Sequence, residues 1–407
     1  MIASPAVRRA LLALGIAAVV AAWIYAFLQL WQTSVPSDLS LPSLDPTRYF
    51  SQEDLDRASS YQAFLRIDSV LALVAELAAL GLFAVKGPAF VRESAAGRIG
   101  TGMMLGMLGL AFVWLSQFPF GLAELWWERK HDVASQSYVT WIINDFLAAG
   151  GEFLFISLAL LIVMALTGLM RRAWWIVAAP ALVAVALAFA LVQPYLLPDQ
   201  HALRDQRIAA DASRLAAAEG IPGTPVKVQD TRSLGGSPNA LAAGLGPTQR
   251  VVLWDTLIRR FSPPEVRVVL AHEFAHLARH HLWKLFAWMA LLGVPIAFLV
   301  ALATRRRGGL YEPAAVPLAI FVVAALLLVT LPLQNAFSRR LEAEADWVAL
   351  QTTRDPAAMT DLFRRLGRLS KAQPDPPGWD EVMFGDHPSI IKRIEMAQAW
   401  KESNPGR

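Results

Sequence analysis

Seven stretches of this chain are long and apolar enough to cross a lipid bilayer, and they constrain its fold more than any other feature. A membrane-spanning helix needs about 20 predominantly apolar residues. The predicted spans are residues 11–31, 69–85, 99–116, 146–170, 174–197, 282–304 and 314–333. The composition, 55% hydrophobic and 17% charged, is also typical of a membrane protein. We therefore predict a mainly α-helical integral membrane protein with about seven transmembrane helices.

Several classes of protein are disfavoured by simple counts. The absence of cysteine excludes disulfides, thiol nucleophiles and cysteine-ligated zinc. A net charge of +4 without a long basic run gives no indication of nucleic-acid binding. The first apolar stretch follows two arginines, as in a signal peptide, but it is too long and has no clear cleavage site of small residues. We interpret it as a retained first span.

Polar segments interrupt the spans and divide the chain into four predicted parts. Residues 1–198 form an N-terminal membrane domain with five spans, and residues 282–337 hold spans six and seven. Residues 199–281 and 338–407 are the two parts of one soluble domain, which the last two spans split. In the first part, residues 199–219 have the pattern of an amphipathic helix, and residues 224–230 and 250–255 that of short strands.

The motif His272-Glu273-Phe274-Ala275-His276 carries the clearest chemistry. Ser262 and Glu265 form a capping-box pattern, with prolines between them, that predicts the start of a helix through this motif. Four residues advance a helix about 6 Å and return to nearly the same face, so both imidazoles can reach one Zn²⁺. Glu273 then stands beside that face and can take a proton from a water molecule that the metal activates.

The third ligand is less clear from spacing. Glu342, Glu344 and Asp346 are all available after span seven; Glu342 and Asp346 share one helical face, whereas Glu344 points elsewhere. A charged surface helix would have the same pattern. His280 lies about 12 Å along the axis from His272, too far for a shared ion. We interpret His280 and His281 as polar residues at the start of span six.

The chain resembles the M48 metallopeptidases of the Ste24 type, also called type I CAAX prenyl proteases. That family pairs H-E-x-x-H with a downstream E-x-x-x-D, which Glu342 and Asp346 match. Four further stretches are similar and stand in the same order: residues 50–62, 117–133, 237–258 and 386–397. Asp132 stands where a glycine is usual in the family.

The resemblance implies one zinc ion per chain, bound by His272, His276 and Glu342, with Glu273 as general base. Asp346 would orient a ligating histidine from outside the ligand set. Asn239 and Ala240 would lie on an edge strand that pairs with the substrate backbone, and His387 and Arg393 would help to bind the peptide carbonyl or developing oxyanion. The implied fold is a ring of seven helices around a chamber, with a small α+β protease domain of the gluzincin type.

We therefore expect a membrane-embedded zinc metalloendopeptidase that acts on peptides or membrane-associated proteins, in CAAX-box processing or membrane-protein quality control. A catalytically inactive scaffold or lipid-binding chamber with a structural zinc is the alternative. Expected partners are the substrate, which could be lipidated, and membrane lipids, but not nucleic acid. The expected location is a bacterial inner membrane, or the endoplasmic reticulum or inner nuclear membrane of a eukaryote. Glu76 and Glu152 lie within spans, where a water-filled chamber would explain them.

Overall fold

The structure is a computed structural model that describes residues 5–90, 97–231 and 238–405. Within these residues, seven helices are long and apolar enough to span a membrane. They are α1 (Pro5–Leu30), α2 (Gln52–Lys86), α3 (Gly97–Lys130), α4 (Tyr138–Met170), α5 (Trp174–Leu196), α9 (His281–Thr304) and α10 (Val316–Thr353). Each predicted span coincides with one of them, apart from one or two end residues. The prediction of a multi-pass α-helical membrane protein is confirmed.

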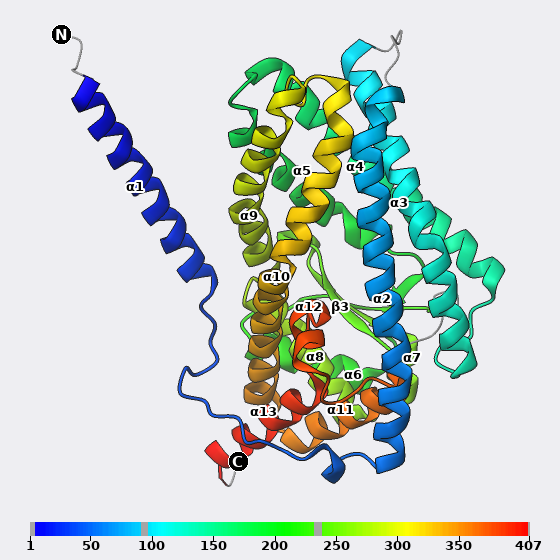
Figure 1. Cartoon of the computed structure of the whole chain (residues 1–407). Coiled ribbons are helices and arrows are strands. Elements are labelled where there is room, and N and C mark those ends of the chain that lie inside the picture. The colour runs from blue at the N-terminus through cyan, green and yellow to red at the C-terminus, as the bar shows by residue number, and fades with distance from the viewer. Residues whose placement is uncertain (1–4, 91–96, 232–237, 406–407) are drawn as a thin grey trace.

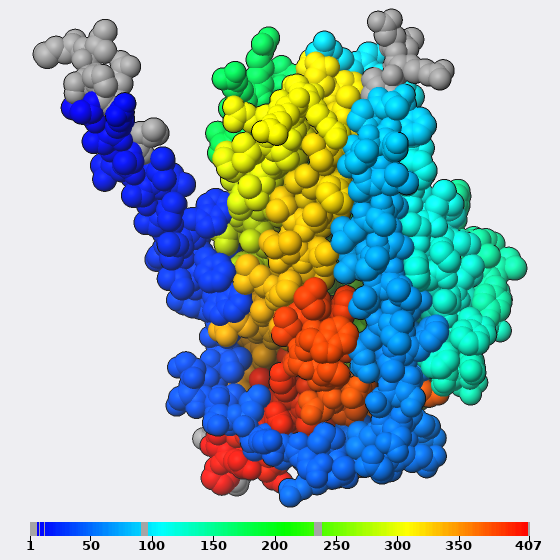
Figure 2. Space-filling view, in the orientation of Figure 1, coloured from blue at the N-terminus to red at the C-terminus, as the bar shows by residue number. Residues whose placement is uncertain are grey.

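Six of the spanning helices form a closed ring. Helices α2, α3, α4, α5, α9 and α10 each pack against the next, and α10 returns to pack against α2 (Figure 1). Helix α1 lies outside this ring, where Phe27 and Trp31 pack against Trp288 of α9. The rest of α1 leans away from the bundle (Figure 2). Of the two carboxylates predicted within spans, Glu76 is half-buried and Glu152 is exposed.

Several spanning helices continue beyond their apolar segments. Helix α10 runs without interruption past the predicted end of span seven at residue 333 and across the predicted domain boundary after residue 337. Glu342 and Asp346 of the E-x-x-x-D motif therefore lie on the same continuous helix as the last span. After α3, Asp132 adopts the left-handed conformation, with φ of 57°. This is the position where the family usually has glycine, and aspartate tolerates that conformation better than most other residues.

The soluble part lies at one end of the ring and is built around a four-stranded sheet (Figure 1). The strand order is β1 (Gln200–Ala202), β2 (Val226–Gln229), β4 (Arg250–Trp254), β3 (Ala240–Ala243). Strands β2 and β4 are parallel, while β1 and β3 run antiparallel to their neighbours. Thus β3 is an edge strand. Ser237, the first residue of the matched stretch that leads into β3, lies outside the described residues.

Helices complete the soluble part around one apolar core. They are α6 (Gln206–Ala218), α7 (Asp255–Arg260), α8 (Pro263–Ala278), α11 (Pro356–Ser370), α12 (Gly378–Phe384) and α13 (Ile390–Ser403). The core joins residues from both sides of spans six and seven, among them Leu253, Leu270, Leu350 and Met359, all fully buried. One expectation needs correction: residues 199–219 are not all helical, because β1 pairs with β2 before α6 begins.

Candidate metal centre and cleft

Helix α8 carries the H-E-x-x-H residues and is fixed at its start by the predicted cap. The Ser262 backbone N–H donates to a Glu265 carboxylate oxygen 2.6 Å away, and prolines occupy the first turn. Phe274 and Ala275 are fully buried, so one face of the helix packs into the core and holds the histidine face in register. Helix α10 approaches closely because Ala275 and Ala345 are the side chains at the contact.

Three potential ligands converge between these two helices. His272 Nε2 lies 3.0 Å from His276 Nε2 and 3.2 Å from Glu342 Oε2, and His276 Nε2 lies 3.5 Å from Glu342 Oε1. Tetrahedral zinc with ligands at 2.0–2.1 Å would space its ligand atoms about 3.3 Å apart. Since imidazole nitrogen and carboxylate oxygen are common zinc ligands, this donor set fits a zinc ion in both chemistry and spacing.

The charges around His272 also favour a cation. Burial alone would lower the pKa of His272, but the hydrogen bonds and charges of Asp346 and Glu342 outweigh it and raise the pKa to about 10. Burial and the neighbouring His272 lower the pKa of His276 to about 3, so its ring stays neutral with a free lone pair. In this structure the site therefore stabilises one positive charge beside Glu342, the charge that a metal ion would otherwise supply.

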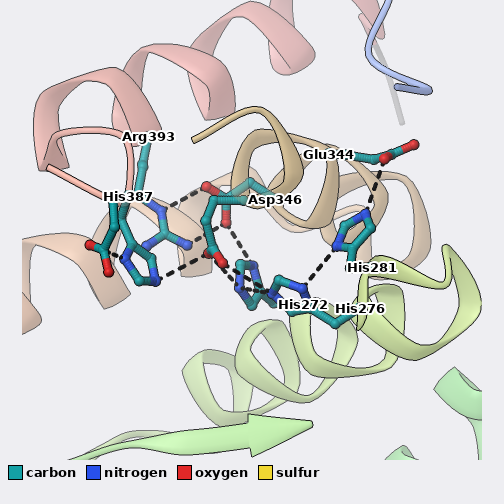
Figure 3. Close-up of polar contacts among 9 residues, drawn as sticks. His272, His276, His281, Glu344, Asp346, His387 and Arg393 are labelled. Atoms are coloured by element: carbon teal, nitrogen blue, oxygen red, sulfur yellow. Dashed lines mark hydrogen bonds and ion pairs between the residues drawn. The ribbon is translucent and has the colours of Figure 1, made fainter. Parts of the chain in front are cut away.

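Asp346 holds the outer side of His272. Its Oδ1 lies 2.9 Å from His272 Nδ1. Arg393 grips the same carboxylate with two hydrogen bonds, from Nε at 2.7 Å and from Nη2 at 2.6 Å (Figure 3). The guanidinium also stacks over the Phe363 ring. Because both Asp346 and Arg393 are largely buried, this pair fixes the His272 ring with its Nε2 toward the other ligands.

All nine site residues predicted from the sequence line one cavity of about 330 Å³. They are Asn239, Ala240, His272, Glu273, His276, Glu342, Asp346, His387 and Arg393. His387 Nε2 lies 3.3 Å from Glu342 Oε2, and its side chain remains half exposed. The hydrogen bond from Nδ1 to Asp386, 2.8 Å long, raises the pKa of His387. This favours the protonated ring, which can donate a hydrogen bond into the cavity.

Strand β3 forms one wall of the cavity. The Asn239 carbonyl accepts from Trp254 N–H, and the register pairs Leu241 with Val252. In an antiparallel ladder the alternate residues, Ala240 and Ala242, then turn their backbone groups to the free edge. The Ala242 N–H hydrogen-bonds the Glu273 carboxylate. Burial raises the pKa of Glu273 despite that hydrogen bond.

One residue was assigned no role from the sequence but belongs to this site. His281 is at the start of span six, as predicted, yet only 2% of its side chain is exposed and its Nδ1 lies 2.8 Å from His276 Nδ1. The chain bends back at His280, which adopts the left-handed conformation (φ 55°) although it is not glycine. The periodicity of a straight helix does not place His281 beside His276. The adjacent polar pair at the start of an apolar span was the available signal in the sequence.

Comparisons with known proteins agree with this architecture. Residues 202–401 match the family described as "Peptidase family M48". The chain is 25% identical over 288 residues to the "Uncharacterized metalloprotease YhfN" of Bacillus subtilis, a match that covers 67% of each protein. It is 26% identical over 226 residues to the "CAAX prenyl protease 1 homolog" of Dictyostelium discoideum, covering 52% of each.

A bacterial relative and a solved structure extend the comparison. "Protease HtpX homolog 1" of Streptomyces coelicolor is 31% identical over 208 residues, which cover 45% of this chain and 66% of that protein. The crystal structure of S. mikatae Ste24p superposes with a TM-score of 0.70 at 18% identity, over 93% of this chain and 96% of that one. At this identity the likeness concerns the fold, which is shared almost throughout.

Proposed function

Because this chain belongs to peptidase family M48 and is a membrane-embedded metalloprotease, we propose that it hydrolyses peptide bonds with one zinc ion held by His272, His276 and Glu342. The observation that carries this assignment is the convergence of three side chains, whose nearest ligand atoms lie 3.0 to 3.5 Å apart, beside the buried carboxylate of Glu273. When bound, the zinc would polarise a water molecule and the scissile carbonyl.

Proton transfer is assigned to Glu273. Its carboxylate takes up a proton from the attacking water and passes it to the nitrogen of the leaving amine. A general base works best when its pKa lies near the working pH. Burial, which raises the pKa of Glu273, moves the group in that direction. The hydrogen bond from the Ala242 N–H holds this carboxylate beside strand β3, along which the substrate would lie.

Substrate positioning is assigned to the β3 edge and to two cationic side chains. The backbone groups of Ala240 and the Ala242 carbonyl face the free edge and would pair with an extended substrate, and Asn239 borders the same edge. His387 would donate a hydrogen bond to the carbonyl oxygen as negative charge develops on it. Arg393 has two N–H groups on Asp346, so it supports His272 through that carboxylate and leaves its other donors for the substrate.

The substrates we propose are peptides or membrane-associated proteins that reach the cleft from the bilayer or its surface. The ring of spanning helices directly above the soluble part supports such a route (Figure 1). A lipidated tail is one member of this class, suggested by the name of the Dictyostelium relative. The inactive scaffold with a structural zinc is the alternative that the following experiment separates.

The test compares the purified protein with Glu273→Gln in detergent. Bound zinc is measured in each, and cleavage of a long unstructured peptide is followed with and without a zinc chelator. We expect about one zinc per chain in both proteins, and cleavage, lost on chelation, in the parent only. Zinc in both proteins with no cleavage of any peptide or membrane-protein substrate offered would favour the scaffold. No zinc in the folded parent would refute the ligand assignment.

A further inference from the structure

His281 is a buried polar residue that the proposed reaction does not use. It begins α9, directly after the bend at His280, and its ring meets His276 at a centroid distance of 4.9 Å. On one side its Nδ1 lies 2.8 Å from His276 Nδ1; on the other its Nε2 lies 3.0 Å from Glu344 Oε2 (Figure 3). Both ring nitrogens are therefore engaged by protein groups.

The contact between the two Nδ1 atoms can hold only one hydrogen, which fixes the direction of the chain. If His276 Nε2 offers its lone pair beside Glu342, the neutral ring carries its hydrogen on Nδ1. His276 Nδ1–H then donates to His281 Nδ1. His281 in turn carries its hydrogen on Nε2 and donates to the carboxylate of Glu344. Both hydrogen bonds of this series therefore run in the same direction: each donor lies on the His276 side and each acceptor on the Glu344 side.

Glu344 is itself held firmly as the final acceptor. Only 3% of its side chain is exposed. The Ser34 backbone N–H donates to its Oε1 at 2.6 Å, and Lys284 Nζ donates to its Oε2 at 2.8 Å. These donors come from the segment after α1 and from α9, so the carboxylate is fixed and its negative charge is stabilised. A fixed acceptor at this end favours the tautomer of His281 whose Nε2–H faces it.

We propose that His281 is a positioning residue that holds His276 in the tautomer and orientation required for metal binding, with Glu344 as its anchor. The inference rests on the metal site proposed above. A matching support stands behind His272, where Asp346 contacts Nδ1 directly. Metal-ligating histidines commonly donate their second N–H to such a partner, whose loss typically weakens metal binding about 10–100-fold. On the His276 side, a second imidazole is inserted between the ligand and the carboxylate.

The test uses a matched set of substitutions and measures the zinc dissociation constant by competition with a chelator. His281→Gln can accept at Oε1 and donate at Nε2 in the same order as the imidazole, so we expect its zinc affinity to stay within about threefold of the parent. His281→Asn is too short to bridge His276 and Glu344, and we expect about 10–100-fold weaker binding. His280→Asn, the same change at the exposed neighbour, should bind zinc like the parent.

Size-exclusion chromatography and thermal unfolding of the zinc-free proteins show whether each variant is folded. If His281→Asn does not fold, Glu344→Gln replaces it, with about tenfold weaker zinc binding expected. Equal zinc affinity of the parent and the folded His281→Asn or Glu344→Gln protein would overturn this inference alone. A parent that binds no zinc would overturn the metal site and this inference with it.

Discussion

Single side chains decide whether the cavity can hold a metal ion, and Glu342 is central among them. It contributes an oxygen to the site and the negative charge that balances a cation. We expect Glu342→Gln to weaken zinc binding more than about 100-fold, because a neutral amide is a poor zinc ligand. Metal analysis after dialysis is the measurement. Asp361→Asn, an exposed carboxylate on α11, is the control, and a full zinc complement in Glu342→Gln would contradict the assignment.

His387 has a different expected effect, since it borders the ligands without belonging to them. If it stabilises charge on the carbonyl oxygen, His387→Asn should lower kcat about 100-fold and leave bound zinc unchanged. The substitution His201→Asn, at an exposed histidine on β1, should change neither quantity. Loss of zinc in His387→Asn would instead make His387 part of the metal site.

At the scale of secondary-structure elements, the exposed edge of β3 makes a prediction about substrates. Pairing with Ala240 and Ala242 uses alternate backbone N–H groups of a bound peptide. A series of peptides, each N-methylated at one position near the cleaved bond, should therefore lose cleavage at every second position. The unaffected alternate positions serve as internal controls. Uniform loss, or no loss at any position, would argue against strand pairing as the mode of binding.

The packing of α6 on α8 gives a prediction about pH. Both carboxylate oxygens of Glu219, the residue directly after α6, are buried, and this burial raises its pKa to about 8 despite the positive charges of Arg279 and His272. The folded protein therefore binds a proton at Glu219 more tightly than the unfolded chain does. The resulting stabilisation of the folded state is fully present below about pH 4.5 and is lost as the pH rises to about 8. Each unit of pKa difference corresponds to about 1.4 kcal/mol.

We therefore expect Glu219→Gln to raise the unfolding temperature relative to the parent at pH 8 and to have little effect at pH 5. Thermal unfolding of both proteins at several pH values is the measurement. Glu402→Gln, at an exposed position on α13, should leave the pH dependence unchanged. A difference in unfolding temperature between Glu219→Gln and the parent that stays constant across this pH range would contradict the raised pKa of Glu219.

For the molecule as a whole, the proposed metal site joins parts of the chain that are far apart in sequence. The proposed ligands lie on α8 and α10, and in the sequence spans six and seven separate His276 from Glu342. Zinc should therefore stabilise the assembled soluble part, by about 2.7 kcal/mol when free zinc is 100 times its Kd. We expect chelation to lower the Tm of the parent by several degrees but to leave the Tm of Glu342→Gln unaffected. An equal response of both proteins would contradict this coupling.

Much of the architecture could be predicted from sequence because it depends on local patterns. Runs of about 20 apolar residues determine membrane helices wherever they lie. The four-residue spacing of His272 and His276 on a capped helix determines that both rings share a face. For the same reason Glu342 and Asp346 could be recognised as a pair on one side of a helix. The predicted division into domains remains an interpretation, since α10 runs through one of its boundaries.

The tertiary structure decided which elements contact one another, because no local pattern in the sequence specifies their relative positions. Arg393 grips Asp346 because α13 packs against α10. His281 contacts His276 because the backbone of His280 adopts the left-handed conformation. A histidine at this position did not indicate that conformation. Sequence periodicity describes which face of a helix a side chain occupies. Which other helix covers that face depends on packing across the whole chain, and that packing places the side chains that support the proposed metal ligands.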